Sequence, residues 1–264
     1  MTSTTSADRF SQHAFVGISA SLFVSSVTLT IVWCASMSAM GQMTMPGGWT
    51  MSMAWMRMPG QTWAGAAASF LCMWIVMMAA MMLPSLIPML RRYREAVGRT
   101  RERRLGSLTV LVGIGYFVVW TAFGAVVFPL GVGLTAIEME HPWLARATPT
   151  AIGVVVLIAG VLQFTTWKDR HLVCAREAPW SGGTVSADAA TAWRHGVRIG
   201  VHCVHCCANL MAILLVIGVM DLRAMAIVTA AVTVERLAPA GERVARAVGA
   251  VVVGSGLFLI GAGL

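Results

Sequence analysis

The sequence predicts an all-α fold, a polytopic bundle of helices that cross a membrane about seven times. Hydrophobic residues make up 58% of the 264 residues and charged residues only 11%, whereas a soluble domain carries about 25% charged residues. The apolar residues also gather in long segments, and about 20 of them in a row span a bilayer. The predicted spans are residues 15–35, 63–90, 108–130, 150–167, 200–220, 224–237 and 245–264.

Each predicted span carries its own signal. The first lacks a small-residue cleavage pattern, so we expect a retained span and not a signal peptide. The second is rich in methionine and contains Pro84, which we expect to kink it. The fourth contains Gln163, which we expect to hydrogen-bond to another helix. The sixth is short and ends at Glu235 and Arg236. If it is re-entrant, the bundle has six spans. We also expect Glu235 to face the bundle interior, paired with Arg236 or Arg243.

The Lys and Arg residues set the expected orientation, because cytoplasmic loops of membrane proteins are enriched in them. With a cytoplasmic N-terminus, sixteen of the 19 positive residues fall in inner segments and three in outer segments. We therefore expect one domain, residues 1–264, in the inner (plasma) membrane with its C-terminus outside. The net charge of +8 follows mostly from this bias, so we expect the lipid bilayer as a partner and no nucleic acid.

Three segments between the spans have distinct compositions. Residues 36–62 form an outer loop that is rich in methionine. Residues 91–106 form a basic cytoplasmic loop, and residues 168–199 form a longer cytoplasmic loop.

A cluster of soft ligands opens the fifth span, in the run HCVHCC at 202–207. Positions three or four apart share a face of a helix, so Cys203 and Cys207 fall on one stripe that Met211 continues. Thiolate and imidazole groups suit one soft transition metal ion. The candidate ligands are Cys203, Cys206, Cys207, His202, His205 and Met211. The alternative is that the cysteines are ordinary buried residues and the histidines lie at the headgroup level.

Methionines form two further groups. Eight of them lie between Met37 and Met58 in the outer loop, and thioether sulfur is a ligand that suits Cu(I). The alternative is a loop that lies on the membrane, with tryptophans at the interface. In the second span, Met77 and Met81 lie on one stripe and Met82 on another. Together with the cysteines they would form a route for a soft metal from outside to inside, although packing alone also explains them.

Two motifs carry a family resemblance. The run MWIVMMAAMMLPSLIPML at 73–90 and the run GVRIGVHCVHCCANLM at 196–211 resemble the predicted metal-binding integral membrane proteins of domain of unknown function 2182. The resemblance covers the chain from about Trp49 to Gly249 and implies a helical membrane protein that binds a metal. The pattern of that family reads roughly Cys-x-Gly-Cys-Cys-Trp-x-Leu-Met. Here His205 stands in place of the glycine and Ala208 in place of the tryptophan.

Three functions remain open from the sequence. The first is binding of a soft transition metal, Cu(I) above others, for uptake, storage or delivery, with a metallochaperone or a membrane metalloenzyme as partner. In this interpretation the chain is not an enzyme, Cys203, Cys206 and Cys207 bind the ion with His202 or His205, and Met77, Met81 and Met82 pass it inward. The second is a membrane thiol oxidoreductase or an assembly factor. The third is a helical accessory subunit of a larger complex.

Overall fold

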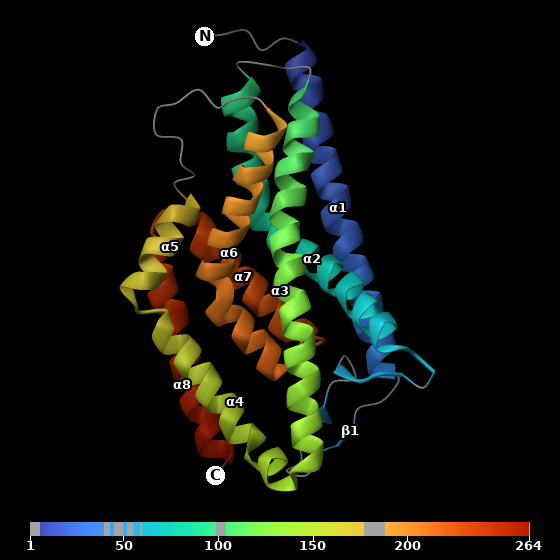
Figure 1. The fold of residues 1–264 in the computed structure, drawn as a ribbon. Helices are drawn as coiled ribbons and strands as arrows, with labels where there is room; N and C mark the ends of the chain where they lie inside the picture. Colours follow the sequence, from blue (N-terminus) through green and yellow to red (C-terminus); the bar gives the residue numbers. More distant parts are fainter. Residues whose placement is uncertain are drawn as a thin grey trace.

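The computed structural model describes residues 6–39, 43–44, 50–51, 55–58, 60–98, 104–176 and 188–263. It confirms the all-α prediction, with eight helices and one pair of two-residue strands in these residues (Figure 1). In chain order the elements are α1 (Ser6–Ala39), β1 (Met43–Thr44), β2 (Thr50–Met51), α2 (Trp63–Gly98), α3 (Leu105–Glu140), α4 (Pro142–Leu162), α5 (Thr166–Arg176), α6 (Ala189–Ile217), α7 (Leu222–Leu237) and α8 (Gly241–Gly263).

Six helices of the described chain are long and apolar enough to cross a membrane. They are α1, α2, α3, α4, α6 and α8. Helix α7 has 16 residues, fewer than a bilayer requires, which favours the six-span alternative. It still reverses the chain, so that α1 begins at one end of the bundle and α8 finishes at the opposite end (Figure 1).

The connecting segments hold more structure than their composition indicated. Helix α2 continues through the start of the basic segment to Gly98, and α3 begins at Leu105. The segment 168–199, predicted to be a cytoplasmic loop, contains most of α5 and the first turns of α6. In the outer loop, β1 and β2 pair antiparallel, with Met43 opposite Met51.

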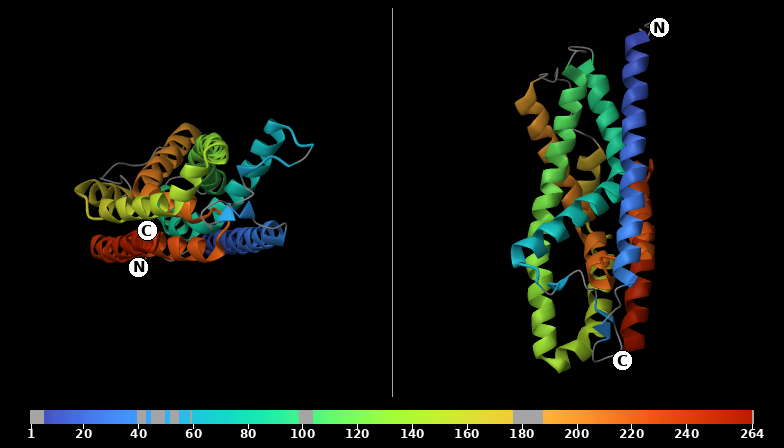
Figure 2. Two further views of the ribbon diagram at one scale, coloured as in Figure 1. Left: turned by 90° about the horizontal axis from the view of Figure 1, so that it is seen from below. Right: turned by 90° about the vertical axis from the view of Figure 1, so that its right-hand side faces the viewer.

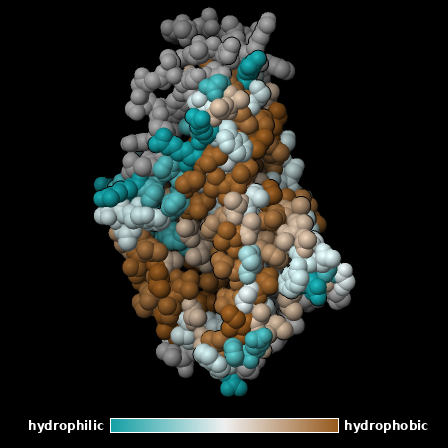
Figure 3. Space-filling model, in the orientation of Figure 1, coloured by the Kyte–Doolittle hydropathy of each residue, from teal (hydrophilic) through white to brown (hydrophobic). Residues whose placement is uncertain are grey.

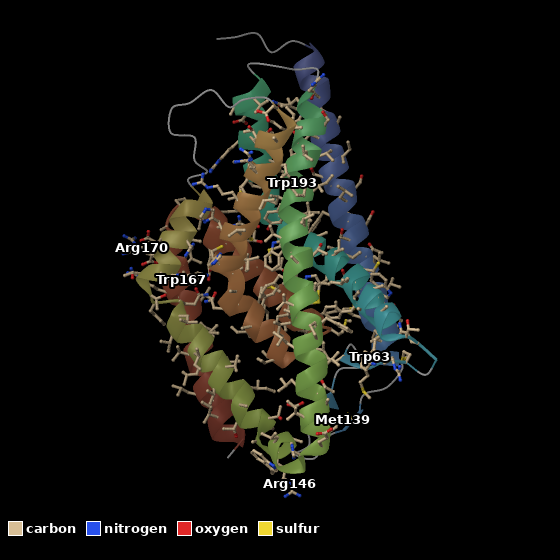
Figure 4. The ribbon with its side chains drawn as sticks, in the orientation of Figure 1. Trp63, Met139, Arg146, Trp167, Arg170 and Trp193 are labelled. Carbon is tan, nitrogen blue, oxygen red and sulfur yellow. The ribbon has the colours of Figure 1, made fainter. Side chains whose placement is uncertain are left out.

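The surface divides by polarity along the bundle (Figure 3). Large apolar side chains stand exposed on the outer helices, among them Ile18 of α1 and Phe258 of α8. Lipid is the environment in which such side chains lie without cost. Arg170 on α5 and Arg146 at the turn between α3 and α4 lie well apart along the bundle (Figure 4).

Glycines allow two pairs of helices to approach closely. A Cβ on Gly196 of α6 would lie 2.2 Å from the Val112 oxygen of α3, a distance that real Cβ atoms do not show. A Cβ on Gly160 of α4 would lie 2.8 Å from the Val253 nitrogen of α8, and these two helices run side by side (Figure 2). Small residues at helix contacts are typical of membrane bundles, because dispersion forces replace the hydrophobic effect there. The contact between α3 and α6 positions the site described next.

Candidate metal centre

Three cysteine thiols gather on one turn of α6. The Sγ atom of Cys207 lies 3.8 Å from that of Cys203 and 3.4 Å from that of Cys206, and all three lie within 4.8 Å of one another. All three side chains are buried. Three thiolates bound to one ion at about 2.3 Å lie about 3.8–4.0 Å apart. The thiol cluster, Cys203, Cys206 and Cys207, therefore has a spacing that fits a metal ion.

Helix α3 supplies a phenol to this cluster. The Tyr116 hydroxyl lies 3.0 Å from Cys203 Sγ, and both residues are fully buried. The two side chains meet because α6 approaches α3 closely beside Tyr116, where α6 carries a glycine. A Cβ on Gly200 would lie 3.0 Å from the Tyr116 carbonyl oxygen. A thiolate at Cys203 accepts a hydrogen bond from this hydroxyl.

Helix α7 supplies a guanidinium. Arg236 Nη1 donates to Cys203 Sγ at 3.0 Å and to Ser85 Oγ at 2.9 Å, and its Nη2 donates to Met89 Sδ at 3.1 Å. The side chain is only 5% exposed. The guanidinium thus links the thiol cluster to the second half of α2.

A buried guanidinium requires a negative charge nearby, because an isolated ion in a low-dielectric interior costs several kcal/mol or more. Glu235, its neighbour in the chain, faces the interior as predicted, but its salt bridge is with Lys168 and not with the expected arginine: Lys168 Nζ lies 2.8 Å from Glu235 Oε2. Cys203 is the acid that Arg236 contacts by hydrogen bond in the described residues. The geometry therefore favours Cys203 as a thiolate, which is the form that binds metal.

A second buried network supports the thiol helix from α4 and α5. Lys168 Nζ donates to the Cys206 carbonyl oxygen, and Gln163 Nε2 donates to Glu235 Oε1 at 2.9 Å. Lys168, Glu235 and Gln163 are all at most 2% exposed. Gln163 thus bonds to another helix, as its place in the fourth span predicted. The network fixes the thiol-bearing turn against α5 and α7.

The histidines lie against α5. The rings of His205 and His171 stack with centroids 5.1 Å apart, and those of His202 and His171 lie 6.2 Å apart. The ring centroids of Trp167 and His171 lie 4.7 Å apart. Burial lowers the pKa of His171, and charge on His205 and His202 lowers it further. The thiols form a compact group without imidazoles, so the predicted cysteine and histidine ligands separate. His202 and His205 instead lie beside His171, which was not a predicted ligand, and the three form a histidine group.

The predicted methionine ligands are buried in the same hydrophobic core as the thiols. Met77, Met81, Met82 and Met211 are at most 2% exposed. Met82 lies three residues before Ser85, and Met89 lies four after it, so the three share a face of α2. This face meets Arg236. The structure therefore adds Met89 to the methionines that sequence reasoning selected.

The outer methionine loop lies mostly outside the described residues. The side chains of Met40, Met43, Met45, Met51 and Met53 are among those that the structure does not describe. Trp55 packs on Phe70, with ring centroids 5.3 Å apart, and Trp63 is 53% exposed. A role of this loop in metal capture stays a prediction.

Three residues of the site were missed by sequence reasoning. Tyr116 and Arg236 come together with Cys203 across 87 and 33 residues of chain, and no local periodicity indicates such contacts. The sequence identifies Lys168 only as one of the positive charges of the predicted cytoplasmic loop. One signal was available, because Lys168 is the only lysine among 19 positive residues. A strong preference for arginine makes a single lysine at a span boundary a candidate for a buried role.

The fold and the site together define a class: a helical bundle of membrane-spanning proportions that holds three buried thiols at metal-binding distances. The family model PpoB2, described as a copper chaperone, matches residues 71–259. The match covers well over half of the chain and includes the whole thiol cluster. The chain belongs to this copper chaperone family, which confirms the metal-related part of the expected resemblance. No curated protein matches the chain, and no solved structure does.

Proposed function

We propose that this chain is a multi-pass protein of the plasma membrane that binds Cu(I) at the thiol cluster and delivers it to a partner metalloprotein. One observation carries the proposal. Three buried Sγ atoms lie within 4.8 Å of one another, and the buried guanidinium of Arg236 donates a hydrogen bond to Cys203 Sγ. Soft thiolates select Cu(I) over hard ions, and Arg236 offsets the negative charge that they gather.

The membrane orientation rests on the charge of the loops. In the topology predicted from the sequence, sixteen of the 19 positive residues fall in segments on the side of the N-terminus, and the side richer in positive residues is cytoplasmic in membrane proteins. The thiol cluster lies in the middle of α6, where α5 and the C-terminal part of α7 pack against it through Lys168. We propose that copper exchanges between this cluster and the cytoplasm.

The test is the Cu(I) content and affinity of the reduced, detergent-purified protein under anaerobic conditions. The wild type is expected to bind about one Cu(I) per chain, and the triple variant Cys203→Ser, Cys206→Ser, Cys207→Ser is expected to bind none. Cys72→Ser is the matched control, because Cys72 is an exposed cysteine on α2. Equal Cu(I) binding by the wild type and the triple variant, or none by either, refutes the proposal.

A thiol oxidoreductase is the second candidate, and the proximity of the Cys203 and Cys206 Sγ atoms, which lie within 4.8 Å of one another, is what favours it. The single variant Cys207→Ser separates the two functions. It removes one ligand of a three-thiolate site and weakens Cu(I) binding. It leaves a redox pair of Cys203 and Cys206 intact, so disulfide exchange would persist.

A further inference from the structure

The histidine group brings together three imidazoles from two helices. His171 comes from α5, while His202 and His205 lie three residues apart on α6 and therefore share a face of that helix. His205 is exposed and the other two are half-buried. Arg170, next to His171 on α5, lies in a hydrophilic part of the surface (Figure 3 and Figure 4). An ion from the surrounding water can therefore reach these imidazoles, whereas the thiols are buried.

The spacing of the rings fits one shared metal ion. An imidazole nitrogen binds a transition metal at about 2.0–2.1 Å, which places the ring centroid about 3.2 Å from the ion. Two rings on one ion then have centroids about 4.5 Å apart at a right angle and about 6.4 Å apart on opposite sides. The measured separations from His171, 5.1 Å to His205 and 6.2 Å to His202, fall within this range.

One ring must turn before all three direct a nitrogen at the same point, because the planes of His171 and His205 are only 17° from parallel. The Nδ1 atom of His205 lies 2.8 Å from the Val201 carbonyl oxygen. A carbonyl only accepts, so this nitrogen carries the proton and Nε2 keeps its lone pair. A ring whose second nitrogen donates to a backbone carbonyl is typical of a metal-binding histidine. His205 is thus the fixed member of the group.

The other two imidazoles each have an unsatisfied nitrogen. The Nδ1 atoms of His171 and His202 are buried and have no hydrogen-bond partner in the described part of the chain. A buried polar atom without a partner costs about 1–3 kcal/mol, and a metal ion bound to it removes this cost. Because no hydrogen bond to Nδ1 fixes the His171 ring, this ring can turn out of the stack toward a shared ion.

The ligand type indicates the class of metal. Imidazole is a neutral ligand that suits zinc, copper, nickel and iron, and among their divalent ions Cu(II) binds most tightly. We propose that His171, His202 and His205 form a second metal site, which binds a divalent transition metal ion and prefers Cu(II). This site is separate from the thiol cluster, whose soft thiolates suit Cu(I), and it does not depend on the function proposed above.

The test is Cu(II) binding to the untagged, full-length protein in detergent. The variant Cys203→Ser, Cys206→Ser, Cys207→Ser is used, so that the buried thiols cannot reduce the ion. One bound Cu(II) per chain is expected, with hyperfine coupling to imidazole nitrogen in its electron paramagnetic resonance spectrum. Addition of His171→Gln is expected to raise the Kd for Cu(II) at least tenfold, since even loss of an outer-shell partner costs about 10–100-fold. His13→Gln is the matched control, because His13 is an exposed histidine on α1.

Titration with Ni(II), which thiols do not reduce, gives a second measurement in a chain that keeps its cysteines. His171→Gln is expected to weaken Ni(II) binding relative to the wild type, whereas its Kd for Cu(I) stays within threefold. If His171→Gln and His205→Gln bind both divalent ions within threefold of their parent proteins, the histidines only stack and the site is overturned. A wild type that binds Ni(II) through the histidines but no Cu(I) refutes the proposed function and supports this second site.

Discussion

Arg236→Gln is the sharpest test of the charge balance at the thiol cluster. The substitution removes the positive charge that lies 3.0 Å from Cys203 Sγ and leaves a shorter, neutral polar side chain. Hydrogen bonds to charged groups contribute about 1.5–3 kcal/mol, and each 1.4 kcal/mol corresponds to a tenfold change in Kd. The expected result is that the Kd for Cu(I) rises about 10- to 150-fold.

The assay is a competition for Cu(I) against a chromophoric chelator, with reduced protein in detergent and without oxygen. Arg243→Gln is the control, because Arg243 is an exposed arginine at the start of α8. Arg236→Lys keeps the positive charge but loses the forked guanidinium that reaches Ser85 and Met89. Its Kd for Cu(I) should therefore fall between that of the wild type and that of Arg236→Gln. If folded Arg236→Gln binds Cu(I) within threefold of the wild type, the guanidinium does not compensate the thiolates.

Two further predictions concern the helices that support the site. Lys168→Met should lower the free energy of unfolding by about 3–5 kcal/mol, because it leaves the buried Glu235 carboxylate without its cation. The control is Arg170→Met, at an exposed position on α5. Equal melting temperatures of the two variants would contradict a stabilising ion pair between Lys168 and Glu235. Gly196→Ala should cost about 1–3 kcal/mol and weaken Cu(I) binding, because its Cβ would overlap α3. Gly113→Ala, whose Cβ meets nothing within 4 Å, is the control, and a loss of the same size there would refute the packing argument.

Local pattern predicted the helices well, because long apolar segments and helical spacing are properties of neighbouring residues. The run HCVHCC predicted three thiols on one turn, and the structure places them there. The length of α7 also follows the sequence, since Glu235 and Arg236 end its apolar run.

Contacts between distant segments could not be predicted in the same way. His202 and Cys206 lie four residues apart on α6, so helical spacing alone placed them in one ligand set. Which neighbour each side chain meets depends on the packing of α3, α5 and α7. The structure stacks the imidazole of His205 on His171 and places the ring of His202 at a tilt beside it. The guanidinium at Cys203 likewise depends on how α7 returns into the bundle.

The distance along the chain between the parts of the thiol site has a consequence for biosynthesis. Tyr116, Lys168 and the cysteines leave the ribosome before Arg236, which is 33 residues beyond Cys203. Until α7 packs against α2 and α6, the thiols lack their guanidinium and Lys168 lacks the Glu235 carboxylate. Completion of the thiol site is therefore tied to the arrival of the last helical hairpin, and we expect a nascent chain to bind Cu(I) less tightly than the finished protein.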